Sequence, residues 1–176
     1  GCTYILDASS AKGYFNNCEF EQNRRPISLY TGNPCKSLIM DSCIFLANGV
    51  GNATDQQITD GLVGAIHTSS ITNCIFWKTS ELIGGGNYEI NCLSGNWTIK
   101  NCLFKKGISY IGDAISIAGW YAGTYTPVVT IQNCTFDGTY NNSAIHVGGL
   151  STLTLKDNII TNGNRGIIKD NGTPTV

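Results

Sequence analysis

The chain has 176 residues, which is about the size of one domain and long enough to bury a substantial core. Its formal net charge of -1 and its isoelectric point near 6.1 leave no broad basic surface, so we expect no nucleic-acid partner. No apolar run approaches the roughly 20 residues of a membrane span, so we expect no such span.

A first strand is predicted near the start of the chain, where Cys2, Tyr4 and Leu6 alternate with other residues. The chain begins with Gly1, and no charged segment followed by an apolar one comes after it. We therefore expect any targeting signal to have been removed or to lie upstream of this fragment. Isoleucine outnumbers leucine by 21 to 11, which favours strands over helices along the rest of the chain.

Five segments share the pattern apolar-x-(Asn/Ser)-Cys-x-Phe. In chain order they are FNNCEF (15–20), MDSCIF (40–45), ITNCIF (71–76), IKNCLF (99–104) and IQNCTF (131–136). A sixth segment, LKDNII (155–160), has Asn158 at the cysteine position. The repeat length of 24 to 32 residues is typical of solenoids, in which each unit buries its apolar face on its neighbours. The chain has no CxxC pair, which argues against a zinc ribbon or finger.

A second short element recurs between these segments. Its copies are PISL, GAIHT, YEINC, DAISI, SAIHV and RGIIK, with the inward residues Ile27, Ile66, Ile90, Ile115, Ile145 and Ile167. Each unit therefore has three short strands: this one, one that ends before the Asn–Cys pair, and Cys-x-Phe. The pattern predicts an all-β fold, a right-handed parallel β-helix of about six three-strand rungs, as a single domain over residues 1–176.

A leucine-rich repeat is the competing solenoid. LSTLTLKDNII (150–160) fits its template, in which Cys can replace Asn. That fold needs a helix or a 3₁₀ segment after each strand, whereas the segments after each Phe, such as EQNRR and DGTYNNS, consist of turn residues. The β-helix is therefore favoured.

The residue before each cysteine is predicted to form a corner with a left-handed backbone, which asparagine tolerates well. These corner residues are Asn17, Asn73, Asn101 and Asn133, with Ser42 and Asp157 as substitutes. The next residue and the Phe two positions later are predicted to point inward. They form a thiol ladder of Cys18, Cys43, Cys74, Cys102 and Cys134 beside a ring ladder of Phe20, Phe45, Phe76, Phe104 and Phe136. We expect free packing thiols; redox or metal chemistry at these cysteines is the alternative.

The segments FEQN (20–23), FLAN (45–48), VGAI and SAIHVGG resemble the F-x-x-N and G-G-A-I repeats of polymorphic outer-membrane proteins. These proteins belong to the larger pectate-lyase-like group of right-handed β-helices, and similar repeats occur in adhesin-like surface proteins. The resemblance covers about residues 4–169, although only two F-x-x-N copies are intact. It implies an extracellular or cell-surface location, and in the pectate-lyase-like group a polysaccharide substrate is common.

Enzymes of that group carry clustered Asp, Lys, Arg or His on or beside the outer face of the first sheet. The corresponding outward column here is predicted to contain Ser28, His67, Asn91, Ser116, His146 and Ile168, none of which is a carboxylate. We therefore expect no catalytic residues, no metal site and no cofactor. The two histidines are expected to be exposed polar strand residues about 14 Å apart, too far to share a metal ion, and a ligand contact is the alternative.

Aromatic residues in the loops are the stronger binding signal. Trp120, Tyr121 and Tyr125 lie in the Gly-rich insertion AGWYAGTYTP, and Trp77 follows a different Cys-x-Phe segment. Exposed rings suit sugar stacking or protein contact. The alternative is that they pack the loop against the side of the solenoid.

We therefore expect a noncatalytic extracellular or cell-surface module with a structural or adhesive role, which binds a glycan or a host or cell-surface protein. One alternative is a polysaccharide lyase or hydrolase whose site is incomplete in this chain. Another is a self-stacking filament subunit, because an uncapped solenoid exposes strand edges. We expect the end near Gly1 to be covered by another rung, another domain or a second copy.

Overall fold

The computed structural model describes residues 4–7, 12–21, 25–28, 37–46, 58–59, 68–78, 87–106, 112–118, 126–138, 143–172 and 174–176. These residues form three parallel β-sheets, which we name sheets A, B and C. In spatial order, sheet A contains β1 (Tyr4–Asp7), β4 (Arg25–Ser28), β7 (Ile58–Thr59), β10 (Asn87–Cys92), β13 (Gly112–Ile117), β16 (Ile145–Gly149) and β19 (Ile167–Gly172). Sheet B contains β2 (Lys12–Asn16), β5 (Ser37–Asp41), β8 (Thr68–Thr72), β11 (Asn96–Lys100), β14 (Val128–Gln132) and β17 (Thr152–Lys156). Sheet C contains β3 (Glu19–Glu21), β6 (Ile44–Leu46), β9 (Ile75–Lys78), β12 (Leu103–Lys106), β15 (Thr135–Asp137) and β18 (Ile159–Thr161).

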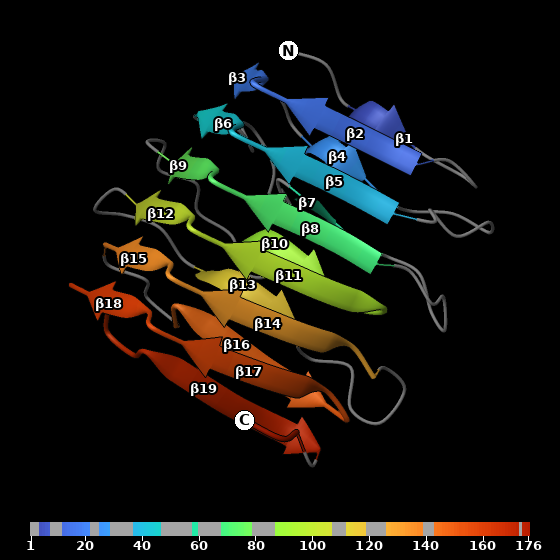
Figure 1. The fold of residues 1–176 in the computed structure, drawn as a ribbon. Coiled ribbons are helices and arrows are strands. Elements are labelled where there is room, and N and C mark those ends of the chain that lie inside the picture. The colour runs from blue at the N-terminus through green and yellow to red at the C-terminus, as the bar shows by residue number, and fades with distance from the viewer. Residues whose placement is uncertain are drawn as a thin grey trace.

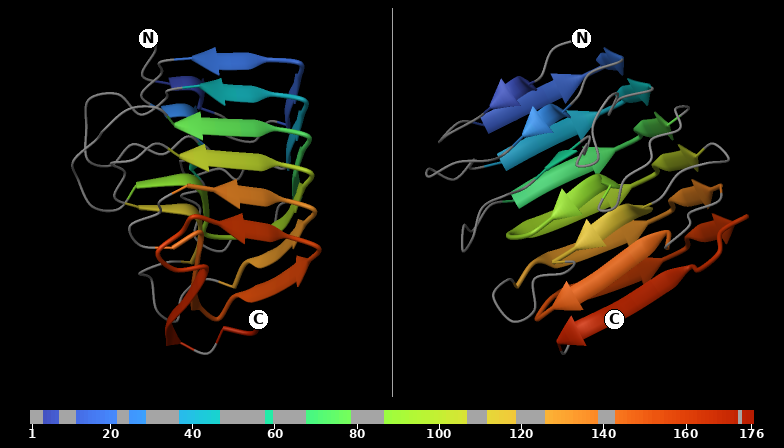
Figure 2. Two further views of the ribbon diagram at one scale, coloured as in Figure 1. Left: turned by 90° about the vertical axis from the view of Figure 1, so that its left-hand side faces the viewer. Right: turned by 180° about the vertical axis from the view of Figure 1, so that it is seen from behind.

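The chain passes through sheets A, B and C in turn and then returns to sheet A one level further along the stack (Figures 1 and 2). Like strands therefore lie on like strands, and every strand pairing is parallel. This arrangement is a parallel β-helix, so the fold class predicted from the repeats is confirmed.

The sequence pattern predicts the wrong residues for one strand of sheet A. The sequence predicts GAIHT, with Ile66 pointing inward, as the sheet A strand of the third coil. The structure instead places β7 there, where Ile58 pairs with both Ile27 and Ile90. Both segments offer a single isoleucine between polar or small residues, so local pattern could not separate them. Residues 64–67 lie outside the described residues.

The corners between sheets B and C follow the predicted backbone geometry. All six corner positions have a positive φ between 51° and 55°: Asn17, Ser42, Asn73, Asn101, Asn133 and Asp157. Side-chain amides link neighbouring coils at these corners. Asn101 Nδ2 donates to Asn73 Oδ1 at 3.1 Å, and Asn73 Nδ2 donates at 2.7 Å to Oδ1 of Asp41, the residue before the corner Ser42. The corner residues thus fix the bend within a coil and also bind one coil to the next.

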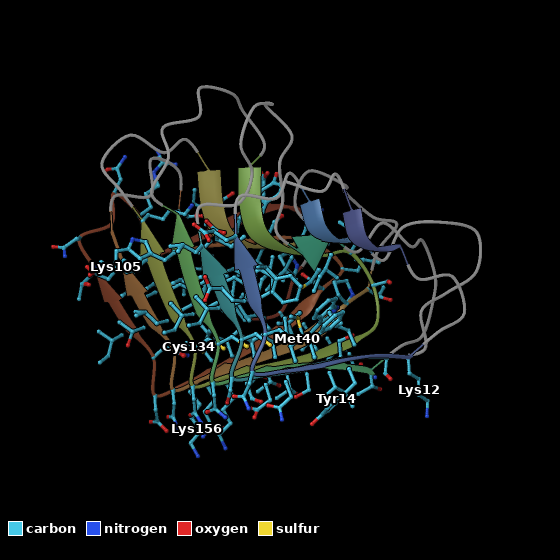
Figure 3. All side chains as sticks on the ribbon, turned by 90° about the horizontal axis from the view of Figure 1, so that it is seen from above. Lys12, Tyr14, Met40, Lys105, Cys134 and Lys156 are labelled. Atoms are coloured by element: carbon cyan, nitrogen blue, oxygen red, sulfur yellow. The ribbon has the colours of Figure 1, made fainter. Side chains whose placement is uncertain are left out.

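Alternate strand residues point into the core or out to solvent, as Figure 3 shows in a view along the stack. Met40 and Cys134 point inward and are fully buried, whereas Lys12, Tyr14 and Lys156 point outward from sheet B and are exposed. Inward side chains at equivalent positions of successive coils therefore stack into columns, and these columns fill the space between the three sheets.

Five phenylalanine rings form the most regular of these columns. They are Phe20, Phe45, Phe76, Phe104 and Phe136, each at most 4% exposed. Successive ring centroids lie 4.6–4.8 Å apart, and the planes of successive rings are nearly parallel, with interplanar angles of 4–9°. The spacing equals the separation of neighbouring strands, so the backbone ladder sets the stacking distance.

The cysteine column lies beside the rings. Cys43, Cys74, Cys102 and Cys134 are buried, Cys18 at the first coil is half-buried, and all five are free thiols. Burial raises the pKa of the Cys43 thiol to about 11. Hydrogen bonds with Cys134 and Cys74, together with burial, raise the pKa of Cys102 above its ordinary value. The thiols at these two positions are therefore neutral at physiological pH and suited to packing.

Asn158 replaces the cysteine in the sixth coil for a reason that the structure makes clear. Its Nδ2 donates to the carbonyl of Ile131 at 2.8 Å, and its Oδ1 accepts from the backbone N–H of Cys134 at 2.9 Å. The Cys134 thiol reaches the equivalent carbonyl, that of Ile99, only at 3.7 Å. The thiol also lies 3.3 Å from the carbonyl of Gln132, so it makes two sulfur contacts with carbonyl oxygens, whereas the amide makes two shorter hydrogen bonds, one of them to a backbone N–H.

Candidate functional site

The outer face of sheet A is buried where β10, β13 and β16 meet. The isoleucines at positions 90, 115 and 145 belong to the core, so the residues that alternate with them point away from it. Those residues include Glu89, Asn91, Ser116 and His146, which are only 1–6% exposed. Polar and charged side chains are thus buried on the face opposite the apolar core.

His146 is the centre of the first feature of this face. Its Nδ1 lies 3.2 Å from Oδ2 of Asp113 on β13, and its Nε2 lies 3.2 Å from Oδ2 of Asp170 on β19. Oδ1 of Asp113 in turn accepts from the backbone N–H of Ser143 at 2.8 Å and from its hydroxyl at 2.5 Å. One imidazole therefore joins three consecutive strands of sheet A. The prediction of an exposed polar histidine is wrong for His146, which is 1% exposed.

The two carboxylates determine the charge of this imidazole. Burial alone lowers the pKa of His146, but the hydrogen bonds and the negative charges of Asp113 and Asp170 outweigh burial and raise that pKa above its usual value. The protonated ring donates from both nitrogens, one to each carboxylate. Neither nitrogen can take up a substrate proton without losing one of these partners, so the arrangement suits a structural bridge better than a general base.

Three oxygen-bearing side chains form the second feature, which we call the oxygen cluster: Glu89, Asn91 and Ser116. Asn91 and Ser116 are register partners on β10 and β13, and Glu89 precedes Asn91 by two residues on the same face. Both carboxylate oxygens of Glu89, Oδ1 of Asn91 and Oγ of Ser116 are buried and have no hydrogen-bond partner within the part of the chain that the structure describes. A buried polar atom without a partner costs about 1–3 kcal/mol, which makes these atoms a candidate site for a bound species.

Only part of this face could have been found from the sequence. The predicted outward column contains Asn91, Ser116 and His146. The same alternation, extended by two residues along a strand, leads from Asn91 to Glu89 and from Ile168 to Asp170. Alternation does not lead to Asp113, which lies two residues before the inward Ile115. Its contact with His146 is made at the start of β13, where the strand pattern does not apply.

Of the four aromatic residues predicted to bind a ligand, Trp77 is the one that lies among the described residues. Trp77 on β9 is 43% exposed on the outer face of sheet C, and Nζ of Lys105, its register partner on β12, lies 5.0 Å from the centre of its ring. Trp120, Tyr121, Tyr125 and His67 lie outside the described residues. The structure therefore places Trp77 and His146 on different sheets, so they belong to separate surfaces.

No family model matches the chain, and comparisons with curated proteins and with solved structures find no match either. The part of the chain that the structure describes contains no helix with the length and hydropathy needed to cross a membrane.

Proposed function

We propose that this β-helix is a noncatalytic extracellular or cell-surface module that binds glycans on the outer face of sheet C. The observation that carries the proposal is the exposed ring of Trp77, held by the ammonium group of Lys105 from the next coil. A flat aromatic ring on a rigid strand can stack on the C–H face of a sugar at little entropic cost.

The neighbours of Trp77 suit the same ligand. Leu46, Trp77, Lys105 and Asp137 are successive register partners across β6, β9, β12 and β15. They therefore form a row with a spacing of about 4.8 Å, in which an apolar platform is followed by a cation and a carboxylate. These charged groups can bond sugar hydroxyls beside a ring stacked on the tryptophan.

The proposed extracellular or cell-surface location is supported by the sequence repeats. Their resemblance to polymorphic outer-membrane and adhesin-like proteins favours an exported or surface-displayed chain, and a rigid solenoid suits display of a binding face. The alternative of a polysaccharide lyase or hydrolase is less well supported, because the buried His146 has both ring nitrogens occupied by carboxylates.

Binding can be tested by screening the purified chain against an array of glycans and titrating each hit in solution. We expect Trp77→Ala to weaken binding at least about fivefold, since loss of a stacking platform costs more than about 1 kcal/mol. Tyr14→Ala is the matched control, because Tyr14 is an exposed aromatic residue, 66% accessible, on sheet B. Absence of any glycan ligand, or equal affinity of the Trp77→Ala variant, would overturn the proposal, as would release of new reducing or unsaturated ends.

A further inference from the structure

We propose that the oxygen cluster of Glu89, Asn91 and Ser116 binds an oxygen-preferring cation, for which calcium is the best candidate. The inference is independent of glycan binding on sheet C, because the cluster lies on the outer face of sheet A. It starts from four buried oxygen atoms, none of which has a hydrogen-bond partner among the described residues.

The chemistry of these atoms indicates the charge of the missing partner. An ionised carboxylate and an amide oxygen only accept hydrogen bonds, and a hydroxyl oxygen can accept as well. Glu89 is 1% exposed, so its charge is poorly solvated, and an isolated buried carboxylate is strongly unfavourable. A water molecule could donate two hydrogen bonds to the cluster, but it would leave the charge of Glu89 uncompensated. A cation satisfies the oxygen atoms and the charge together.

The imidazole of His146 on the neighbouring strand cannot replace that cation. His146 is the register partner of Ser116, but its two nitrogens face Asp113 and Asp170. One imidazolium between two carboxylates leaves this bridge with an excess negative charge, to which Glu89 adds another. A divalent cation would balance the two.

Spacing and ligand type favour calcium among the divalent ions. Asn91 and Ser116 lie on adjacent strands about 4.8 Å apart, and Glu89 is about 6.7 Å along the strand from Asn91, a distance that its longer side chain can span. Calcium accepts six to eight oxygen ligands in irregular arrangements, including bidentate carboxylates and amide oxygens, whereas magnesium requires a near-ideal octahedron. Nitrogen- and sulfur-preferring metals are not favoured by this donor set.

Glu89 is the one acidic side chain of the cluster. Among the residues that the structure describes, no three His, Cys, Asp or Glu side chains are grouped so as to hold a metal ion. The amide of Asn91 and the hydroxyl of Ser116 must therefore contribute, and water can fill the remaining positions. Such a site resembles a modest structural site rather than a tight buffer site, whose affinity depends on several carboxylates.

The test uses the purified chain after dialysis against EDTA. Calcium is then added in isothermal titration calorimetry and, separately, in thermal unfolding. We expect one calcium per chain and a melting temperature that rises by about 5 °C or more when calcium is a hundredfold above its Kd. Magnesium at the same concentration should produce a much smaller shift.

Glu89→Gln distinguishes ligation from a general effect of salt. This variant keeps the shape of the side chain and removes its charge, so we expect it to be at least as stable as the wild type without calcium and to lose the calcium-induced shift. Glu21→Gln is the matched control, since Glu21 is exposed on β3 of sheet C, and it should respond to calcium like the wild type. Ser116→Ala should weaken calcium binding without abolishing folding.

Two results would overturn the inference. One is a wild-type chain whose heat of titration and melting temperature do not change with calcium in the millimolar range. The other is a calcium response that Glu89→Gln retains in full. A response to magnesium that exceeds the response to calcium would overturn the assignment of the ion.

Discussion

His146 shows how one side chain can join three coils of a solenoid. Its two ring nitrogens reach carboxylates on β13 and β19, on either side of its own strand β16. Hydrogen bonds between strands of sheet A already connect these coils through the backbone. The imidazole adds a connection that depends on charge, so its contribution varies with pH.

We predict that His146→Gln destabilises the chain more at pH 5.5 than at pH 9. The folded-state pKa of His146 is raised above its unfolded value of about 6.5, so its stabilising contribution is fully present below that value. The contribution is lost as the pH rises through the folded-state pKa. At pH 5.5 we expect a loss of roughly 1.5 kcal/mol, the low end for a charged hydrogen bond because Asp170 is 25% exposed.

Urea unfolding of both chains at the two pH values measures this difference. A destabilisation that is equal at pH 5.5 and pH 9 would show that the ring acts only through packing.

At the scale of the strand and its turns, sequence and structure agree best where the local backbone conformation alone determines the residue type. The corner positions such as Asn101 and Asn133 could be predicted because a left-handed backbone restricts the choice of residue. The inward Phe at position 76 could be predicted because strand alternation is strict.

Prediction failed where the environment comes from elsewhere in the chain. Alternation assigns His146 and Glu89 to the outer face of their strands, but it does not indicate whether that face is exposed. Both are 1% exposed, so their chemistry differs from that of surface residues. The position of β7 was missed for a related reason, since its pairing with Ile27 and Ile90 is decided by neighbouring coils.

The end of β15 offers a test of close packing between two coils. Gly138 follows β15 and has a φ of +136°, a region that favours glycine. A Cβ at this position would lie 2.8 Å from the carbonyl oxygen of Lys106 on β12 and 3.0 Å from its backbone nitrogen. We predict that Gly138→Ala costs at least about 2 kcal/mol, because backbone strain and overpacking act together.

Gly166→Ala is the matched control. Its added Cβ would meet the Cδ1 of Ile160 at an ordinary contact distance of 3.7 Å. We expect its free energy of unfolding in urea to stay within about 0.5 kcal/mol of the wild type. If the two substitutions cost the same, the close approach of Gly138 to Lys106 does not determine stability.

For the molecule as a whole, contacts are made between neighbouring coils, so stability accumulates along one dimension. A coil in the middle of the stack has two packed neighbours. The sheet B and sheet C strands of the first coil, β2 and β3, pair on one side only among the described residues. At the other end, the Thr175 N–H donates to Ser151 and its carbonyl accepts from Leu153, which adds a short pairing beyond β17. Whether the end near Gly1 is covered stays a prediction, because residues 1–3 lie outside the described residues.

The phenylalanine column allows this dependence on neighbouring coils to be measured, as the loss of unfolding free energy when a ring is removed from the middle or from the end of the stack. The ring of Phe76 is fully buried and stacks on Phe45 at 4.7 Å and on Phe104 at 4.8 Å, whereas Phe20 stacks on Phe45 and makes an edge contact with Phe15 of its own coil. We predict that Phe76→Ala lowers the free energy of unfolding by about 3–5 kcal/mol, the usual cost of removing a buried ring, and that Phe20→Ala lowers it by clearly less. Denaturant unfolding followed by circular dichroism measures both values. Equal costs at the two positions would mean that stability is spread evenly over the coils, which contradicts a stack in which each ring depends on the neighbours above and below it.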